Sequence, residues 1–148
     1  MGFPYNTRTA SVTVTTSAAY SANDVIGGLQ SFKIVDNNGF LQTVQINLNS
    51  TNANQIDFCM FTSSMPNTTF TDNSSIAISS QDFASQGPVV NVTAWNYMGT
   101  GASNGVASGL AYVYPSINSG TMYWALVARG AVTMGSSNGC SVTVTMVS

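Results

Sequence analysis

Apolar and polar residues alternate with a period of two along much of this 148-residue chain, and one alternating segment occurs twice. The segment SVTVT is found at Ser11–Thr15 and again at Ser141–Thr145. Because successive side chains of a β-strand point to opposite faces, each copy predicts a strand with one buried and one exposed face. No window shows a sustained apolar stripe at helical spacing. The sequence therefore predicts an all-β fold.

Further strands and turns follow from the same pattern. Clear alternation predicts strands at Val44–Leu48, Ile56–Met60 and Cys140–Met146. Weaker candidates are Ser31–Val35, Val89–Trp95, Ala107–Tyr114 and Met122–Thr133. Asn-Gly turns are expected at Asp36–Gly39 and Ser136–Gly139, a loop at Gly99–Gly109, and a long connection at Thr62–Pro88 with a minor strand at Ser74–Ser79. We expect an antiparallel, jelly-roll-like β-sandwich of about eight strands, formed by residues 10–148 and preceded by an N-terminal arm at residues 1–9.

The two SVTVT copies have two interpretations. A solenoid would repeat at a short fixed period, and none separates the copies. In a jelly roll the first and last long strands lie side by side in one sheet, which would place the copies together as antiparallel neighbours. Strand propensity and composition alone also produce such a match. We favour the pairing.

The charge content excludes several classes of partner. Charged residues make up 5% of the chain, against about 25% in ordinary domains. Three cations, Arg8, Lys33 and Arg129, at a net charge of −2 cannot neutralise a phosphate backbone, so no nucleic-acid partner is expected. No apolar run approaches the roughly 20 residues of a membrane span, and no membrane partner is expected.

The residues for catalysis are scarce. The chain has no histidine, which removes the usual general base and the commonest transition-metal ligand. Its one lysine, Lys33, is expected in solvent beside a hairpin, and its five aspartates are widely spaced. Segments Asp36–Gly39 and Thr71–Ser75 offer oxygen ligands for calcium, but ordinary turn chemistry explains them better. We expect a protein that is not an enzyme and has no cofactor or metal.

The two cysteines, Cys59 and Cys140, are expected to be free buried thiols, with a single disulfide bridge as the alternative.

Aromatic residues offer two candidate contact sites. Most of them are expected to fill the core, but the sequence Trp95-Asn96-Tyr97 combines rings with an amide, as in a sugar-binding platform. The N-terminal arm contains Phe3, Tyr5 and Arg8, which are typical of a segment that docks on a neighbour. A frayed terminus is the alternative interpretation of the arm.

The segment Arg8–Gly28 resembles the opening of the head decoration, or capsid cement, proteins of tailed phages. In that family an alternating Val/Thr strand is followed by a tyrosine and a short turn, and the matching residues here are Tyr20, Asp24, Val25, Gly27 and Gly28. Similar pieces are found at Phe40–Leu48, Ile56–Phe61, Thr71–Ser79 and Met122–Met134. The resemblance covers most of the chain, although Gly99–Gly109 matches nothing in the family.

The resemblance implies a β-sandwich that is often a homotrimer and binds the major capsid protein on the outside of the phage head. It implies a location on the virion exterior after assembly in the host cytoplasm, and it carries over no catalytic residue. Phe3, Tyr5 and Arg8 are then candidates for capsid or intersubunit contacts. The alternative function is a carbohydrate-binding or receptor-binding module of a virion fibre, with Trp95, Asn96 and Tyr97 at its site.

Overall fold

The computed structural model describes residues 7–16, 19–33, 39–50, 52–113, 120–137 and 139–147, without the side chains of Arg8 and Val113. Its strands are β1 (Thr7–Val14), β2 (Ala19–Tyr20), β3 (Val25–Lys33), β4 (Phe40–Leu48), β5 (Ile56–Phe61), β6 (Gln86–Val92), β7 (Trp95–Tyr97), β8 (Ser103–Ala107), β9 (Tyr112–Val113), β10 (Thr121–Ala128), β11 (Val132–Thr133) and β12 (Cys140–Val147). One short 3-10 helix, η1, covers Phe83–Ser85.

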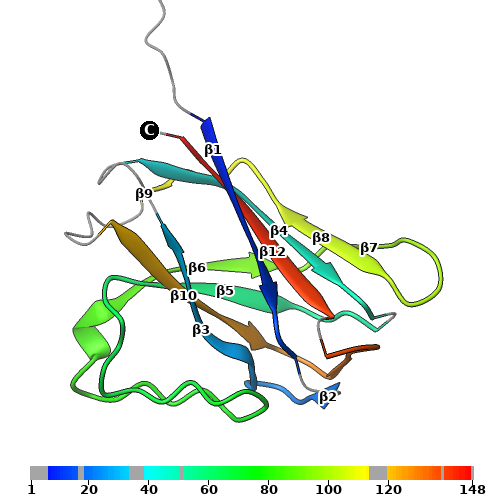
Figure 1. The fold of residues 1–148 in the computed structure, drawn as a ribbon, viewed down its shortest axis with the longest axis horizontal. Coiled ribbons are helices and arrows are strands. Elements are labelled where there is room, and N and C mark those ends of the chain that lie inside the picture. Colours follow the sequence, from blue (N-terminus) through cyan, green and yellow to red (C-terminus); the bar gives the residue numbers. More distant parts are fainter. Residues whose placement is uncertain are drawn as a thin grey trace, which may run out of the picture.

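The strands form two main antiparallel sheets that pack as a sandwich (Figure 1). The six-stranded sheet has the order β1-β12-β4-β8-β7, with β9 also paired to β4. The four-stranded sheet has the order β3-β10-β5-β6, and β2 and β11 form a small separate pair. The predicted all-β sandwich is confirmed.

The pairing of the longer strands is nested. Among the described strands, eight have five residues or more, and the first of these, β1, pairs with the last, β12. Moving inward, β3 pairs with β10, β4 with β8, and β5 with β6. The chain is therefore arranged as one long folded ribbon of paired strands. Its innermost connection, between β5 and β6, is the segment 62–85.

The predicted pairing of the two SVTVT segments is confirmed. In the antiparallel register of β1 and β12, Val12 lies opposite Val142 and Ser11 lies opposite Thr143. On the other side of β12 lies β4, with Val142 opposite Ile46. The last strand therefore occupies an inner position of the larger sheet, between β1 and β4.

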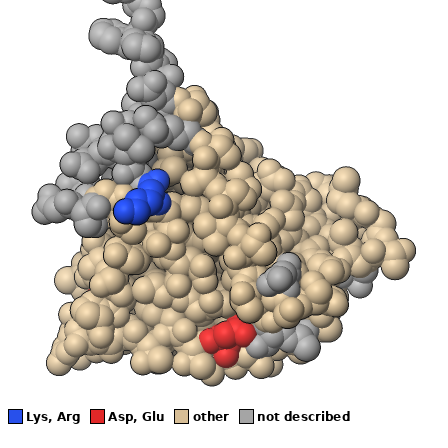
Figure 2. All heavy atoms as spheres, viewed as in Figure 1, with Lys and Arg blue, Asp and Glu red and all other residues tan. Residues whose placement is uncertain are grey.

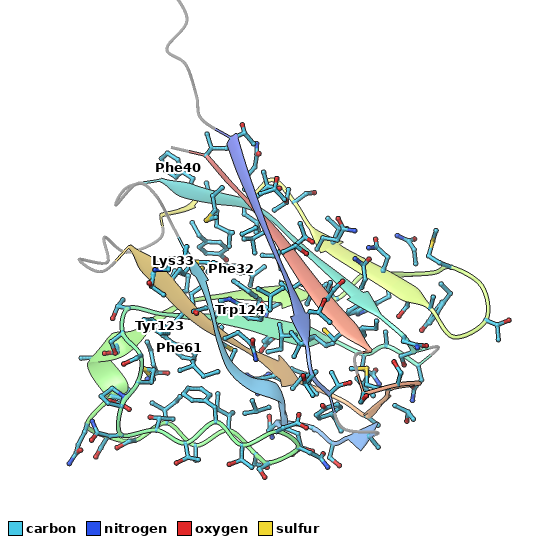
Figure 3. All side chains as sticks on the ribbon, viewed as in Figure 1. Phe32, Lys33, Phe40, Phe61, Tyr123 and Trp124 are labelled. Atoms are coloured by element: carbon cyan, nitrogen blue, oxygen red, sulfur yellow. The ribbon has the colours of Figure 1, made fainter. Side chains whose placement is uncertain are left out.

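The core between the two sheets is built from the apolar positions of the alternating strands. Its centre is Trp124 of β10, which is fully buried and stacks on Phe32 and Phe58 with ring centroids 5.0 and 5.1 Å away (Figure 3). Val142, Val144, Val44 and Ile46 of the larger sheet belong to the same cluster. This core rigidly supports the outer face of the larger sheet.

A second apolar cluster lies on the opposite face of the four-stranded sheet. There the segment 62–85, here called the strap, runs along the sheet and packs its own apolar side chains against it (Figure 1). The cluster joins sheet residues Cys59, Phe61, Ala125, Val127, Leu29 and Tyr123 to strap residues Met65, Phe70, Ile76 and Ile78. As a result, Cys59 is only 6% exposed even though it points away from the main core.

Two carboxylates of the strap are hydrogen-bonded: Asp82 to other residues of the strap itself, and Asp72 to β2 and β3. The Asp82 carboxylate accepts hydrogen bonds from the backbone N–H of Asn67 at 2.9 Å and from Thr68 Oγ1 at 2.7 Å. The Asp72 carboxylate accepts bonds from the Tyr20 hydroxyl and the Gly27 N–H, each at 2.7 Å. The expected minor strand at Ser74–Ser79 is reduced to a single bridge between Ser75 and Asp24.

Several boundaries differ from the sequence prediction. The first strand begins at Thr7, so three residues assigned to the arm belong to β1. The expected strand Ala107–Tyr114 is reduced to β9 at Tyr112–Val113, and the expected loop Gly99–Gly109 is wrong, because β8 occupies Ser103–Ala107 and pairs with both β4 and β7. Low strand propensity concealed β8, yet Gly105 is required there, since an added Cβ would lie 2.8 Å from the Trp95 ring.

Candidate functional site

The outer face of the six-stranded sheet is covered by uncharged polar side chains. One row crosses five strands, because the register places Thr13 beside Ser141, Ser141 beside Asn47, Asn47 beside Asn104 and Asn104 beside Asn96. We call these five residues the amide row. The next row places Ser11, Thr143 and Gln45 side by side. None of the described side chains in these two rows carries a charge.

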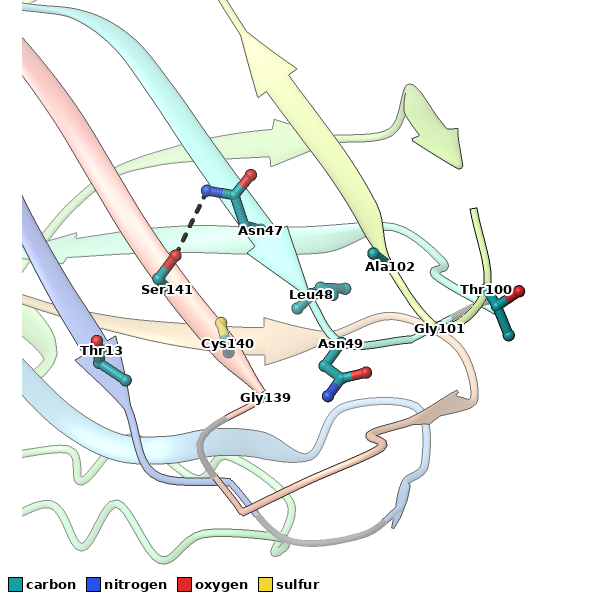
Figure 4. A pocket seen from close by; sticks show the side chains of 10 residues that line it. All are labelled: Thr13, Asn47, Leu48, Asn49, Thr100, Gly101, Ala102, Gly139, Cys140 and Ser141. Carbon is teal, nitrogen blue, oxygen red and sulfur yellow. Dashed lines mark hydrogen bonds between the residues drawn. The ribbon is translucent and has the colours of Figure 1, made fainter. Parts of the chain in front are cut away.

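Side-chain hydrogen bonds connect the strands within these rows. The Thr143 hydroxyl donates to Ser11 Oγ at 3.0 Å, and Asn47 Nδ2 donates to Ser141 Oγ at 3.4 Å (Figure 4). Asn104 Nδ2 donates to Asn47 Oδ1. Such bonds hold the amides and hydroxyls in fixed positions, while their remaining donors and acceptors face solvent. The face is therefore suited to partners that offer neutral hydrogen-bonding groups.

A hollow of about 470 Å³ lies where the amide row reaches the end of the sheet (Figure 4). It is bordered by the end of β4, the β7–β8 loop, the start of β12 and the end of β1. Its polar lining residues are Thr13, Asn47, Asn49, Thr100 and Ser141. A second hollow of about 360 Å³ shares Asn49 and Gly101 with it.

Asn49 separates these two hollows and is fixed by its backbone. Its N–H donates to the Gly139 carbonyl, and its carbonyl accepts from the Gly135 N–H, both at 2.6 Å. Its side chain packs so closely on Gly135 that an added Cβ there would lie 2.7 Å from Asn49 Oδ1. The amide is thus presented on a rigid turn.

The one thiol that lines the larger hollow is not suited to nucleophilic chemistry. Cys140 is 1% exposed, and burial raises the pKa of its thiol to about 12. At neutral pH the reactive thiolate is therefore almost absent. Cys59, beneath the strap, has a pKa raised to about 11, chiefly by burial and further by the Asp57 charge. Both cysteines are free and buried, as predicted.

The clearest ion pair lies elsewhere. Arg129 Nε donates to Asp57 Oδ2 at 2.6 Å, on the strap-covered face of the smaller sheet. Burial by itself raises the Asp57 pKa, but hydrogen bonds from Gln55, Asn91 and Arg129, together with the Arg129 charge, outweigh it and hold the pKa below its usual value. With its carboxylate fully bonded, this group has a structural role.

The predicted sugar platform does not assemble on one face. Strand β7 pairs Trp95 with Gly105 and Tyr97 with Ser103, which lie on the core side of β8, whereas Asn96 pairs with Asn104 on the outer face. Trp95 is half-buried against the main core, and Tyr97 is 57% exposed at the sheet edge. The strand therefore brings Asn96 into the amide row and directs both rings away from it.

The predicted arm contacts fall mostly outside the described residues. Phe3 and Tyr5 lie there entirely. Arg8 is described by its backbone alone, which lies in β1 opposite Met146.

An apolar hollow at the opposite end of the same face was not anticipated from the sequence. It measures about 270 Å³ and is lined by Phe40, Gln42, Leu110, Ala111 and Val147. Strict alternation from Val44 would place Phe40 inside, but a β-bulge adds one residue between Leu41 and Thr43, so Leu41 is buried and Phe40 is 50% exposed (Figure 3). No feature of the sequence indicates the bulge, because alternation simply assigns Phe40 to the core.

Comparison with known proteins gives no family assignment: no family model matches the chain, and no curated protein matches its sequence. Within the described ranges no helix is long and apolar enough to cross a bilayer. The same residues contain no group of three or more Cys or Asp side chains placed to hold a metal ion.

Proposed function

We propose that the chain is a capsid decoration protein, which binds the outside of a tailed-phage head and stabilises its shell. The observation that carries the proposal is the broad neutral face of the six-stranded sheet, with one hollow at each end. Figure 2 illustrates how few charged groups one side of the molecule presents. A protein with such a surface attaches through hydrogen bonds and apolar contacts in place of ion pairs.

The strand order supports the jelly-roll assignment and, with it, the proposal. Nested pairing of eight strands, with β1-β12-β4-β8 packed on β3-β10-β5-β6, is the arrangement expected of a rolled ribbon of two Greek keys. Jelly rolls are common in viral capsid proteins and also in lectins. The fold therefore agrees with both candidate functions, and the surface must decide between them.

Attachment by neutral contacts has a physical consequence for a repeated lattice. Each hydrogen bond to the major capsid protein contributes only about 0.5–1.5 kcal/mol, so a single copy binds weakly. A homotrimer engages several lattice positions together and gains affinity by avidity. Because no charge is involved, this affinity is little affected by ionic strength.

The second candidate, a carbohydrate-binding module at a fibre tip, is favoured by the larger hollow. Its lining supplies amides and hydroxyls from four segments and no charge, which matches the chemistry of an uncharged sugar. The hollow contains no aromatic ring for sugar stacking, since Trp95 and Tyr97 lie away from it. We therefore place decoration first.

Immunogold electron microscopy of virions of the encoding phage tests the proposal. Label spread evenly over the head supports decoration, label at fibre tips supports the alternative, and virions without label contradict both. A Thr143→Lys variant places a charge in the middle of the neutral face, and we expect head occupancy to fall at least about tenfold through the cost of burying that charge. Val89→Lys, at an exposed position on edge strand β6 of the other sheet, is the matched control and should bind normally.

A further inference from the structure

The apolar hollow beside Phe40 differs from the rest of the outer sheet face. Its lining combines the half-exposed ring of Phe40 with Leu110, Ala111 and Val147, in a face whose other described residues are mostly Ser, Thr, Asn and Gln, with Val106 beside Gln45 as a further exposed apolar residue. Its volume of about 270 Å³ is below the roughly 300–1,000 Å³ of typical small-molecule sites. An exposed apolar depression of this size fits one large side chain of another protein segment.

The hollow lies next to the place where the N-terminal arm joins the sheet. Thr7, the first residue of β1, pairs with Val147 of β12, and Val147 pairs in turn with Phe40 of β4. The residues that precede Thr7 have the sequence MGFPYN, with two aromatic rings, a proline and no charged side chain. Arm and hollow are therefore chemically complementary, because both are apolar and uncharged.

We propose that this hollow binds the N-terminal arm of a second copy of the chain, with Phe3 as the ring that enters it. The copy's own arm is poorly placed to do so. To reach its own hollow, the arm would have to turn sideways at the start of β1 and cross two strand spacings, about 9.5 Å, in place of continuing along the line of the strand.

The length of the arm and the symmetry of the arm–hollow contact both agree with an exchange of arms between copies. Six extended residues span about 20 Å, which is enough to leave one molecule and contact the next. Each copy offers one arm and one hollow, so the contact is heterologous, and a ring of copies satisfies every arm. The inference concerns the isolated chain and does not depend on the capsid proposal, although a closed ring is the form in which a decoration trimer would attach.

Disulfide trapping between two different variants tests the exchange. Phe3→Cys chains and Phe40→Cys chains are purified separately, mixed and oxidised, and a covalent dimer containing one chain of each kind is the expected product. The native cysteines do not compete, because Cys59 and Cys140 are buried. Phe83→Cys, at a 71% exposed phenylalanine in η1, replaces Phe40→Cys in the control mixture, and we expect about tenfold less dimer there.

Two results would overturn the proposal. Equal dimer yields in the two mixtures would show that the disulfides form by random collision. A Phe3→Cys/Phe40→Cys double variant that forms an internal disulfide and no covalent dimer would show that each arm covers its own hollow. Sedimentation gives an independent check. Phe40→Asp should lower the native mass to that of the monomer, as should removal of residues 1–6, while Phe83→Asp should leave it unchanged.

Discussion

At the scale of single residues, Gly27 shows how tightly the two sheets approach each other. It has a φ of +75°, and a Cβ added to it would overlap Cγ1 of Val14 and lie 2.8 Å from the Thr15 carbonyl oxygen. We predict that Gly27→Ala lowers the free energy of unfolding by about 2–4 kcal/mol, from backbone strain and steric overlap together. Gly99→Ala, at φ +95° with open space around it, should cost only about 1 kcal/mol. Urea unfolding measures both, and equal costs would contradict the steric argument.

The Asp57 carboxylate predicts acid sensitivity. Its folded-state pKa is below its usual value, so its contribution to stability is complete above the unfolded pKa near 4 and is lost as the pH falls through the folded-state pKa. We expect the wild-type free energy of unfolding to fall between about pH 5 and pH 2. Asp57→Asn should start less stable at pH 7 and fall less steeply, and an unchanged slope would assign the acid sensitivity to other carboxylates.

Residues also show where sequence reasoning stops. The alternation predicted that Val44, Ile46 and Leu48 point into the core, because apolar residues recur there at every second position. The bulge at Gln42 was not, because one extra residue in a strand leaves no mark in composition. The hollow beside Phe40 depends on that bulge, and therefore it is visible only in the structure.

At the scale of elements, the strap is held mainly by polar bonds and one apolar cluster. We predict that Asp72→Ala, which removes the acceptor for the Tyr20 hydroxyl of β2 and the Gly27 N–H of β3, raises the population of molecules with an open strap about tenfold or more. Cys59 reports this opening, because it lies beneath the strap. Its modification by a thiol reagent should accelerate, while that of Cys140 in the main core should not, and equal acceleration would indicate global unfolding instead.

The alternation of apolar and polar residues identified some strands and missed others. Strands β1, β4 and β12 were anticipated because one face of each is apolar and the other polar, and β5 was anticipated from the alternation of Ile56, Phe58 and Met60, although the strap buries its other face as well. Strand β8 was missed because its sequence, SNGVA, lacks the branched and aromatic residues that favour strands, and its place is set by β4, β7 and the Trp95 ring. The amide row includes Asn104 of β8, so the candidate site was incomplete without it.

At the scale of the whole molecule, the rarity of ionisable groups predicts a stability that changes little with conditions. The chain has no histidine or glutamate, and burial raises the pKa of both thiols far above neutrality. We expect the free energy of unfolding to vary by less than about 1 kcal/mol between pH 5.5 and 8 and between about 0.05 and 0.5 M NaCl. Chemical unfolding at a series of these pH values and salt concentrations is the measurement. A free energy of unfolding that depends strongly on salt would indicate long-range charge effects that the surface does not explain.

The inner position of β12 sets the order of events during biosynthesis. The larger sheet needs this strand between β1 and β4, yet β12 follows all the other described strands in the sequence and leaves the ribosome after them. Until then β1 and β4 lack their shared partner, and a nascent chain exposes two adhesive edges to its neighbours on the same polysome. The larger sheet therefore closes only after β12 has emerged, and a ribosome that stalls before Cys140 would release a fragment in which β1 and β4 lack their shared partner.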